Sequence, residues 1–169
     1  DSRIMSPEFA EEAALCLNAN GIRAYVFDSL RPTPELSFAV RELGCVSGIV
    51  ITASHNPREY NGYKVYWDDG AQIVEPHADG VVDEVNAIKD LSEIKIISEE
   101  EARSKGLIID IGAEIDDKYI ETIKKEAIQT DIQGKGDFKI VYSPLHGTGK
   151  RPVERVLKEM GFNAVYTVA

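Results

Sequence analysis

This sequence alternates regularly between segments with a helical apolar period and short segments typical of β-strands, and this pattern limits its possible folds more than any other feature. Up to residue 51 the order is helix, strand, helix, strand, with helices expected at 6–20 and 33–43 and strands at 23–28 and 48–51. The second strand is continuously apolar, which is typical of a strand covered on both faces. The alternation therefore predicts an α/β fold with a largely parallel sheet between helices.

The first expected helix has a clear start and an apolar face. Ser6 is expected to cap its N-terminus, because Pro7 follows at a position where proline is favoured. The apolar residues that repeat at helical spacing are Phe9, Ala13, Cys16 and Leu17.

The middle of the chain continues the pattern less regularly. A strand is expected at 63–67, and Pro76 starts a helix whose apolar face comprises Ala78, Val81, Val82 and Val85. Ser98 and Glu101 form a capping box that predicts a short helix ending near Gly106. A longer helix is expected at 114–129, and no element is predicted between these two helices.

Residues 133–137 are polar and glycine-rich, which predicts a linker between two domains. Beyond it we expect a strand at 138–142, a loop at 143–149, a helix that stops at Gly161 and a strand at 164–168. One β-α-β unit of this size cannot bury both of its faces alone. The sequence therefore predicts one domain over 1–132 and the truncated start of a second over 138–169.

Composition argues against several classes of protein. The 29 Asp and Glu residues outnumber 19 Lys and Arg, so the formal net charge is −10, whereas a nucleic-acid-binding module usually carries a basic face. No apolar run approaches the roughly 20 residues that a membrane span needs, and the N-terminus does not resemble a signal peptide. Cys16 and Cys45 form no CxxC pair, so we expect buried free thiols in a reducing cytoplasm.

The stretch that is most informative about chemistry is 52–64, which leaves the end of the most apolar strand. In open α/β sheets, ligands bind outside the carboxyl ends of the strands. The groups here that suit a phosphoryl ligand are the Ser54 hydroxyl, the His55 imidazole, the Asn56 and Asn61 amides, and the cations of Arg58 and Lys64. The two cations outweigh Glu59, so the local charge is opposite in sign to that of the chain.

Two other chemistries suit this loop poorly. A serine hydrolase elbow of the G-x-S-x-G kind needs glycines at fixed offsets from the serine, but Ser54 is flanked by Ala53 and His55 with no glycine at those offsets. A histidine adjacent in sequence also seldom reaches the hydroxyl of its serine. The pattern of a nucleotide P-loop does not occur. Phosphoryl transfer needs mainly positioning and charge neutralisation, which leaves Ser54 as a possible carrier of the phosphoryl group.

Residues 52–64 read T-A-S-H-N-P-x-x-x-N-G-x-K, which resembles the signature of the α-D-phosphohexomutases, the phosphoglucomutase/phosphomannomutase family. Further matches are D-x-R-x-x-S-P-E at the N-terminus, P-T-P before the second helix, and S-P-L-H-G-x-G at 143–149. The resemblance covers nearly all of the chain in the family's order. It implies a three-layer α/β/α domain with a mixed, mostly parallel sheet, followed by the first β-α-β of a second similar domain.

The resemblance also implies a function and its residues. Enzymes of the family are intramolecular phosphotransferases that interconvert sugar 1-phosphates and 6-phosphates through a phosphoserine and a sugar 1,6-bisphosphate. Here Ser54 would be the phosphoserine, with a phosphate oxygen as one ligand of Mg²⁺, and Lys64 would be the catalytic acid and base. His55, Asn56 and Arg58 would bind phosphate and substrate, a small phosphosugar, with no nucleic-acid or membrane partner.

The sequence also departs from the family's pattern. No D-G-D-G-D-R-like metal loop occurs, and the family's opening T-S-G-x-R segment and its later sugar and phosphate loops are missing. We therefore expect a fragment with little or no turnover of its own, whose preferred sugar and oligomeric state stay open. The alternative is a non-catalytic sugar-phosphate-binding or regulatory module. For 146–149, a tight turn in which Gly147 and Gly149 supply conformational freedom is favoured over a phosphate cradle.

Overall fold

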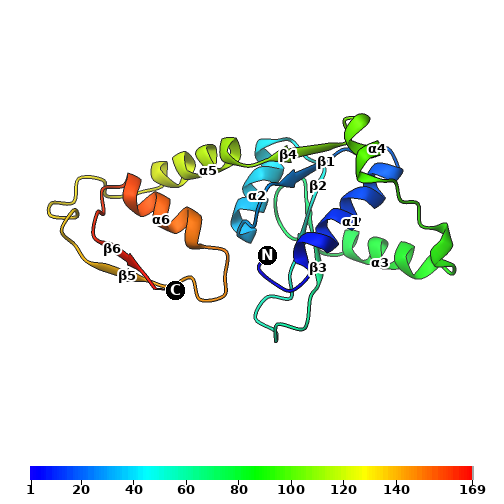
Figure 1. Ribbon diagram of the computed structural model, residues 1–169, viewed down its shortest axis with the longest axis horizontal. Coiled ribbons are helices and arrows are strands. Elements are labelled where there is room, and N and C mark those ends of the chain that lie inside the picture. Colours follow the sequence, from blue (N-terminus) through cyan, green and yellow to red (C-terminus); the bar gives the residue numbers. More distant parts are fainter. Residues whose placement is uncertain (169) are drawn as a thin grey trace.

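Two parallel strands, β1 (Ala24–Phe27) and β4 (Ile108–Ile111), lie in the larger of two lobes in the computed structural model, which describes residues 1–168 (Figure 1). Ala24 aligns with Ile108, and Phe27 aligns with Ile111. No element was predicted at β4, because four residues are too few to show a period. Its partner strand also lies far away in the sequence, where no local pattern reveals the pairing.

Helices cover both faces of this strand pair, because the side chains of a strand alternate between its two sides. The core facing α1 (Ser6–Ala19) and α4 (Glu99–Ser104) comprises Leu15, Ala102 and Ile108, with Val26 and Ile97 packed against them. The core facing α2 (Thr33–Glu42) and α5 (Ala113–Lys125) comprises Ala39, Ile111 and Ile115, with Phe27, Phe38 and Leu43 packed against them. The expected arrangement of helices on both sides of the strands is confirmed.

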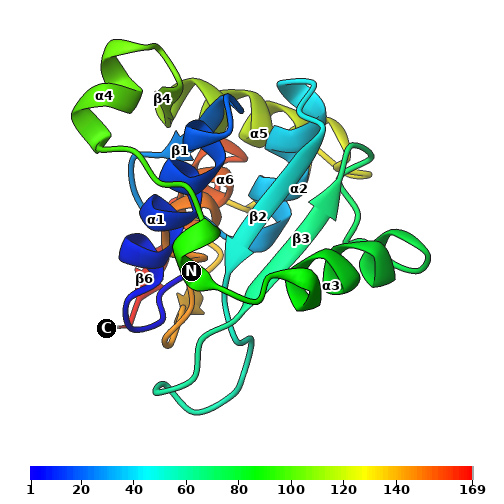
Figure 2. The ribbon, with the colours of Figure 1, turned by 90° about the vertical axis from the view of Figure 1, so that its right-hand side faces the viewer.

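A second pair, β2 (Ser47–Ile51) and β3 (Tyr63–Trp67), is antiparallel, with Ser47 opposite Trp67 and Ile51 opposite Tyr63. Helix α2 lies close against β2, since a Cβ at Gly48 would come within 2.5 Å of Val40 Cγ2. The connection between the two strands extends well beyond their ends (Figure 2). It contains the loop that the sequence singled out.

Helix α1 differs from the prediction in its start and in its buried face. It begins at Ser6, with Met5 at the cap position, and the Ser6 hydroxyl makes no capping bond. The residues that become buried are Ser6, Ala14, Leu15 and Asn18, while Phe9 stays 46% exposed. A polar residue is accommodated on the packed face because the Asn18 amide donates to the carbonyl oxygens of Ile22 and Leu107, at 2.9 and 3.0 Å.

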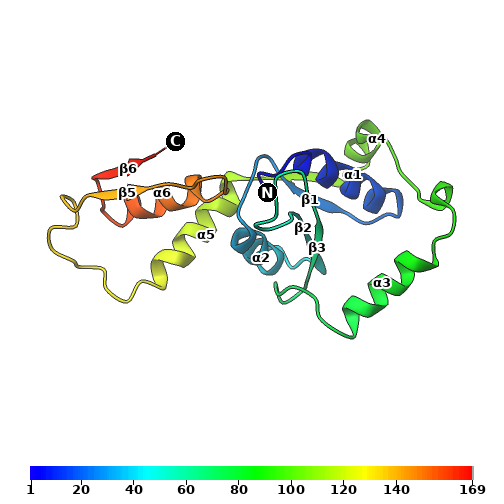
Figure 3. The same cartoon turned by 90° about the horizontal axis from the view of Figure 1, so that it is seen from below.

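Helix α3 (His77–Ala87) projects from the larger lobe (Figure 3), and a single 3₁₀ turn, η1 (Leu91–Glu93), follows it. The helix forms where it was expected, but none of its residues is buried, and Val81, Val82 and Val85 are exposed. Its first residue is held by stacking of the His77 ring on Trp67, with 4.5 Å between ring centroids.

The smaller lobe contains β5 (Ile140–Tyr142), α6 (Lys150–Glu159) and β6 (Val165–Thr167). The two strands are parallel, so the expected β-α-β unit is confirmed, although β5 begins two residues later than predicted. Helix α5 ends at Lys125 and not at 129, and three ion pairs join it to α6: Asp116–Arg151 at 2.8 Å, Asp117–Arg155 at 2.6 Å and Lys124–Glu159 at 3.0 Å. No helix within residues 1–168 has the length and apolar character that crossing a bilayer requires.

Candidate active site

Ser54 lies in the exposed loop that connects β2 to β3, and its backbone has φ +57°, in the left-handed region that few non-glycine residues adopt. The Ser54 amide donates to Thr52 Oγ1 at 3.0 Å, and the Thr52 hydroxyl in turn donates to the carboxylate of Asp1. A hydrogen bond to the buried Thr52 therefore holds the backbone of Ser54 in place, while the Ser54 side chain is exposed to solvent.

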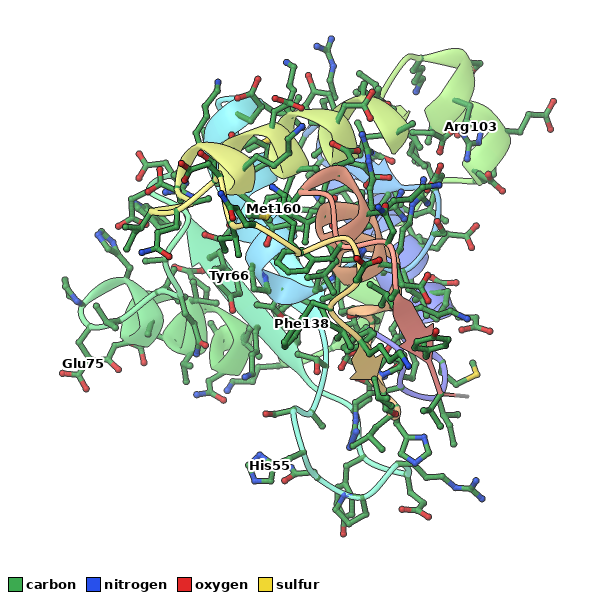
Figure 4. All side chains as sticks on the ribbon, turned by 90° about the vertical axis from the view of Figure 1, so that its left-hand side faces the viewer. His55, Tyr66, Glu75, Arg103, Phe138 and Met160 are labelled. Carbon is green, nitrogen blue, oxygen red and sulfur yellow. The ribbon has the colours of Figure 1, made fainter. Side chains whose placement is uncertain are left out.

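His55 follows Ser54 at the outer part of this loop (Figure 4). Ser54 Oγ and His55 Nδ1 are 3.4 Å apart, which is longer than an ordinary hydrogen bond. The imidazole therefore lies near the hydroxyl without forming a hydrogen bond of ordinary length with it. A phosphoryl group on Ser54 Oγ would be within reach of the imidazole.

Arg3 holds the loop from the N-terminal segment. Its Nε donates to the carbonyl oxygen of Tyr60 at 2.8 Å, and its Nη1 donates to that of Ser54 at 3.3 Å. Nη2 donates to the carbonyl oxygens of Pro57, at 2.8 Å, and Asn56. One guanidinium thus satisfies four backbone acceptors and places a positive charge beside Ser54, which favours an anion there.

The sequence pattern did not predict the contribution of Arg3, because Arg3 lies 51 residues before Ser54. No spacing rule connects residues so far apart. The only signal that could have found it was its place in the D-x-R motif of the family resemblance.

The remaining predicted site residues fall into two groups. Asn56 and Arg58 lie in the same exposed loop as Ser54 and His55, and the Arg58 side chain is 84% exposed, with its Nε 3.8 Å from Glu59 Oε1. A pair so exposed is worth little, so the Arg58 guanidinium is available to a ligand. Lys64 is half-buried on β3, where it aligns with Val50, beyond the loop itself.

Asn61 does not offer its amide to a ligand, contrary to expectation. Its Nδ2 donates to the carbonyl oxygen of Ile4 at 2.9 Å and to Ser6 Oγ at 3.0 Å. Next to it, the Thr52 amide donates to the Gly62 carbonyl oxygen at 2.9 Å. These contacts close the base of the loop.

The loop does not by itself fit a divalent cation. Mg²⁺ requires several oxygen ligands in octahedral geometry, and four loop carbonyls already accept from the positively charged Arg3. Among residues 1–168, no group of three His, Cys, Asp or Glu side chains is placed to hold a metal.

Residues 143–149 form a tight turn at the end of β5. The Gly147 amide donates to the Pro144 carbonyl oxygen at 2.9 Å, and the left-handed residue is Leu145, with φ +50°. The expectation that Gly147 and Gly149 supply this freedom is therefore wrong. At Gly149 a Cβ would lie 2.9 Å from Tyr142 Oη, so a larger residue there would require the tyrosine side chain to shift. Ser2 Oγ donates to the His146 carbonyl oxygen, which links this turn to the segment that holds the Ser54 loop.

Known proteins resemble this chain along its whole length. The family profile described as phosphoglucomutase/phosphomannomutase, alpha/beta/alpha domain I, matches residues 1–92, and the profile of domain II matches residues 117–169. A phosphoglucomutase of Staphylococcus haemolyticus is 40% identical over 168 residues, which are 99% of this chain and 30% of that protein. The Homo sapiens phosphopentomutase is 37% identical over 155 residues, 90% of this chain and 25% of that protein.

The fold has a counterpart among solved structures. A structure described as a phosphomannomutase from Thermus thermophilus superposes with a TM-score of 0.77 at 24% identity, covering 99% of this chain and 35% of that one. At this level of identity the likeness concerns the fold alone. The chain thus spans about a third or less of the length of the proteins that it matches.

Proposed function

This chain belongs to the phosphoglucomutase/phosphomannomutase family, and we propose that it is the part of a sugar-phosphate mutase that carries the phosphoryl group on Ser54. The observation that supports this most strongly is the conformation and exposure of Ser54. Its hydroxyl is exposed at the end of an apolar strand, while its left-handed backbone is held by Thr52 and by the guanidinium of Arg3. Strained residues that their surroundings hold in place are concentrated at functional sites.

The proposed reaction consists of two phosphoryl transfers. A hydroxyl oxygen of the sugar monophosphate attacks the phosphorus on Ser54, the bond from phosphorus to Ser54 Oγ breaks, and a sugar bisphosphate forms. The proton of the attacking hydroxyl passes to a base, and Oγ is protonated as it leaves, so the number of protons is unchanged. Ser54 Oγ then gives up its proton and attacks the other phosphorus of the bisphosphate, the bond from that phosphorus to the sugar oxygen breaks, and the isomeric monophosphate leaves with that oxygen protonated.

The other predicted site residues have roles in this scheme. Lys64 is the candidate acid and base, while Arg58 neutralises the charge of the transferred group and His55 and Asn56 orient it. Arg3 adds a fixed positive charge and keeps the loop in shape. If Mg²⁺ takes part, this chain supplies a phosphate oxygen on Ser54 and the other ligands lie outside it, so no step proposed here depends on the ion.

We also propose a domain organisation and a class of substrate for this protein. We propose that residues 1–132 are the phosphoserine domain, that 133–137 are a linker, and that 138–169 begin a second domain. These residues alone would then turn over little or no substrate. Relatives are named phosphoglucomutase, phosphopentomutase and phosphomannomutase, so we propose a cytoplasmic enzyme for a hexose or pentose phosphate, with a sugar 1,6-bisphosphate as activator.

Substitution of Ser54 in the full-length protein tests this function. Ser54→Ala should abolish isomerisation of glucose 1-phosphate and leave sugar-phosphate binding, measured by calorimetry, nearly unchanged. Ser104→Ala, at an exposed serine of α4, is the matched control and should keep wild-type activity. Full activity in Ser54→Ala would remove Ser54 from the reaction, and binding without turnover in the wild type would favour a non-catalytic sugar-phosphate-binding module.

Substitution of Lys64 separates catalysis from binding. Lys64→Met should lower kcat much more than it raises KM, because a proton-transfer group acts mainly in the transition state. A change confined to KM would show that Lys64 only anchors a phosphate.

A further inference from the structure

Two polar side chains at the base of the Ser54 loop are not used in the reaction scheme. Ser6 is 2% exposed, and its Oγ donates to the Ile51 carbonyl oxygen at 3.1 Å and accepts from Asn61 Nδ2 at 3.0 Å. Asn61 Nδ2 also donates to the Ile4 carbonyl oxygen, and Asn61 Oδ1 accepts from the Gly62 amide, both at 2.9 Å. We call this pair the Ser6–Asn61 clamp.

The clamp connects both ends of the loop to the start of one helix. Ile51 is the last residue of β2, and Asn61 and Gly62 lead directly into β3. Ser6 is the first residue of α1. The two chain segments that enter and leave the loop are therefore fixed to the same point on α1, while Arg3, three residues earlier, holds the carbonyl oxygens between them.

Helix capping does not explain why Ser6 is a serine. A serine at a helix start usually accepts from the amides of the first turn, but no such side-chain bond is made in α1. A buried hydroxyl without a partner is costly, so the bonds to Ile51 and Asn61 are what make Ser6 tolerable in this position. Its interactions are thus directed at the loop.

We propose that Ser6 and Asn61 are positioning residues, which fix the two ends of the loop so that Ser54 Oγ keeps its place during phosphoryl transfer. The inference rests on the proposed role of Ser54. Neither residue touches the transferred group. Because displacement of a reacting group by about 1 Å can cost about 100-fold in rate, a loose base is expected to slow transfer before it weakens binding.

The test compares four variants in the full-length protein: Ser6→Ala, Asn61→Ala, the double variant and Ser37→Ala. Ser37 is the matched control, because its Oγ also donates to a backbone carbonyl oxygen, that of Gly70 at 2.6 Å, away from the Ser54 loop. The measurements are the rate at which glucose 1,6-bisphosphate phosphorylates Ser54, kcat and KM for glucose 1-phosphate, and the melting temperature.

Each clamp variant should slow phosphorylation and kcat on the order of 10- to 100-fold with little change in KM. The double variant should be no slower than the slower single variant, because the two residues act as one unit. Ser37→Ala should keep the wild-type rate even if it lowers the melting temperature as much as the clamp variants do. If Ser6→Ala does not fold, Asn61→Ala, at a half-buried position, provides the same comparison with Ser37→Ala.

Two results would count against the clamp. Clamp variants that transfer as fast as Ser37→Ala would reduce Ser6 and Asn61 to structural residues and leave the role of Ser54 intact. A wild-type protein that takes up no phosphoryl group on Ser54 would overturn the clamp and the proposed function together.

Discussion

At the residue scale, the loop depends on a glycine for which no side chain has room. A Cβ at Gly62 would lie 2.6 Å from the Thr52 carbonyl oxygen, a backbone atom that cannot move away easily. Gly62→Ala should therefore destabilise the protein by about 1–3 kcal/mol, as overpacking does, and should slow transfer at Ser54. Chemical denaturation measures the first effect.

The matched control is Gly80→Ala in α3, where a new Cβ meets nothing within 4 Å. This substitution should not lower the stability, because alanine is the better helix former. If Gly62→Ala were as stable as Gly80→Ala, the loop base would be looser than described.

The residues that carry chemistry were easier to predict than those that support them. Ser54 and His55 are in one contiguous motif, and the end of an apolar strand marks their place. Ser6 and Arg3 approach the loop only in three dimensions, and a serine before a proline has the local pattern of a helix cap. The supporting contacts therefore became visible only in the structure.

At the element scale, α3 is a helix with an apolar face that nothing in residues 1–168 buries. Val85→Ser should therefore change the free energy of unfolding by no more than about 0.5 kcal/mol, as exposed substitutions do. Ile115→Ala, which shortens a buried side chain of α5, should lower the free energy of unfolding by about 2–5 kcal/mol. A large loss in Val85→Ser would mean that the helix is packed.

The elements show what local sequence can and cannot predict. The cap predicted at Ser98 was correct, since Ser98 Oγ accepts from the Glu101 amide at 3.2 Å, whereas the Glu101 carboxylate pairs with Lys105. Strand β4 was missed because it depends on pairing with distant β1. The spacing of Phe9 and Cys16 predicted that α1 is a helix, but which side becomes buried depends on Leu15 meeting Ala102 and Ile108.

At the scale of the whole molecule, a network of charged side chains, in which Arg31, Glu35 and Asp116 are buried, connects the two lobes. Arg31 lies before α2, and its Nε is 2.6 Å from Asp116 Oδ1 of α5 and 3.8 Å from Glu35 Oε1. Arg151 of α6 reaches the other oxygen of Asp116 at 2.8 Å. Burial and the neighbouring Asp116 carboxylate raise the pKa of Glu35 to about 8.

The raised pKa of Glu35 makes the stability of the folded protein depend on pH. The folded state keeps a proton on Glu35 that the unfolded state loses above its ordinary pKa of about 4.5, so this residue makes stability fall as pH rises toward 8. Glu35→Gln should remove that slope, leaving the variant similar to the wild type at pH 5 and more stable at pH 8. Urea denaturation across this range measures the difference.

The control for this slope is Glu12→Gln, which replaces an exposed glutamate of α1 and should keep the wild-type profile. A Glu35→Gln profile parallel to the wild type would mean that Glu35 is charged in the folded protein.

The most direct test of the central claim is to locate the phosphoryl group. The full-length protein is incubated with glucose 1,6-bisphosphate and Mg²⁺, digested, and its peptides are sequenced by mass spectrometry. We expect a phosphate on Ser54 in the wild type and none in Ser54→Ala. A protein that carries no phosphate, or carries it on another residue, would contradict it.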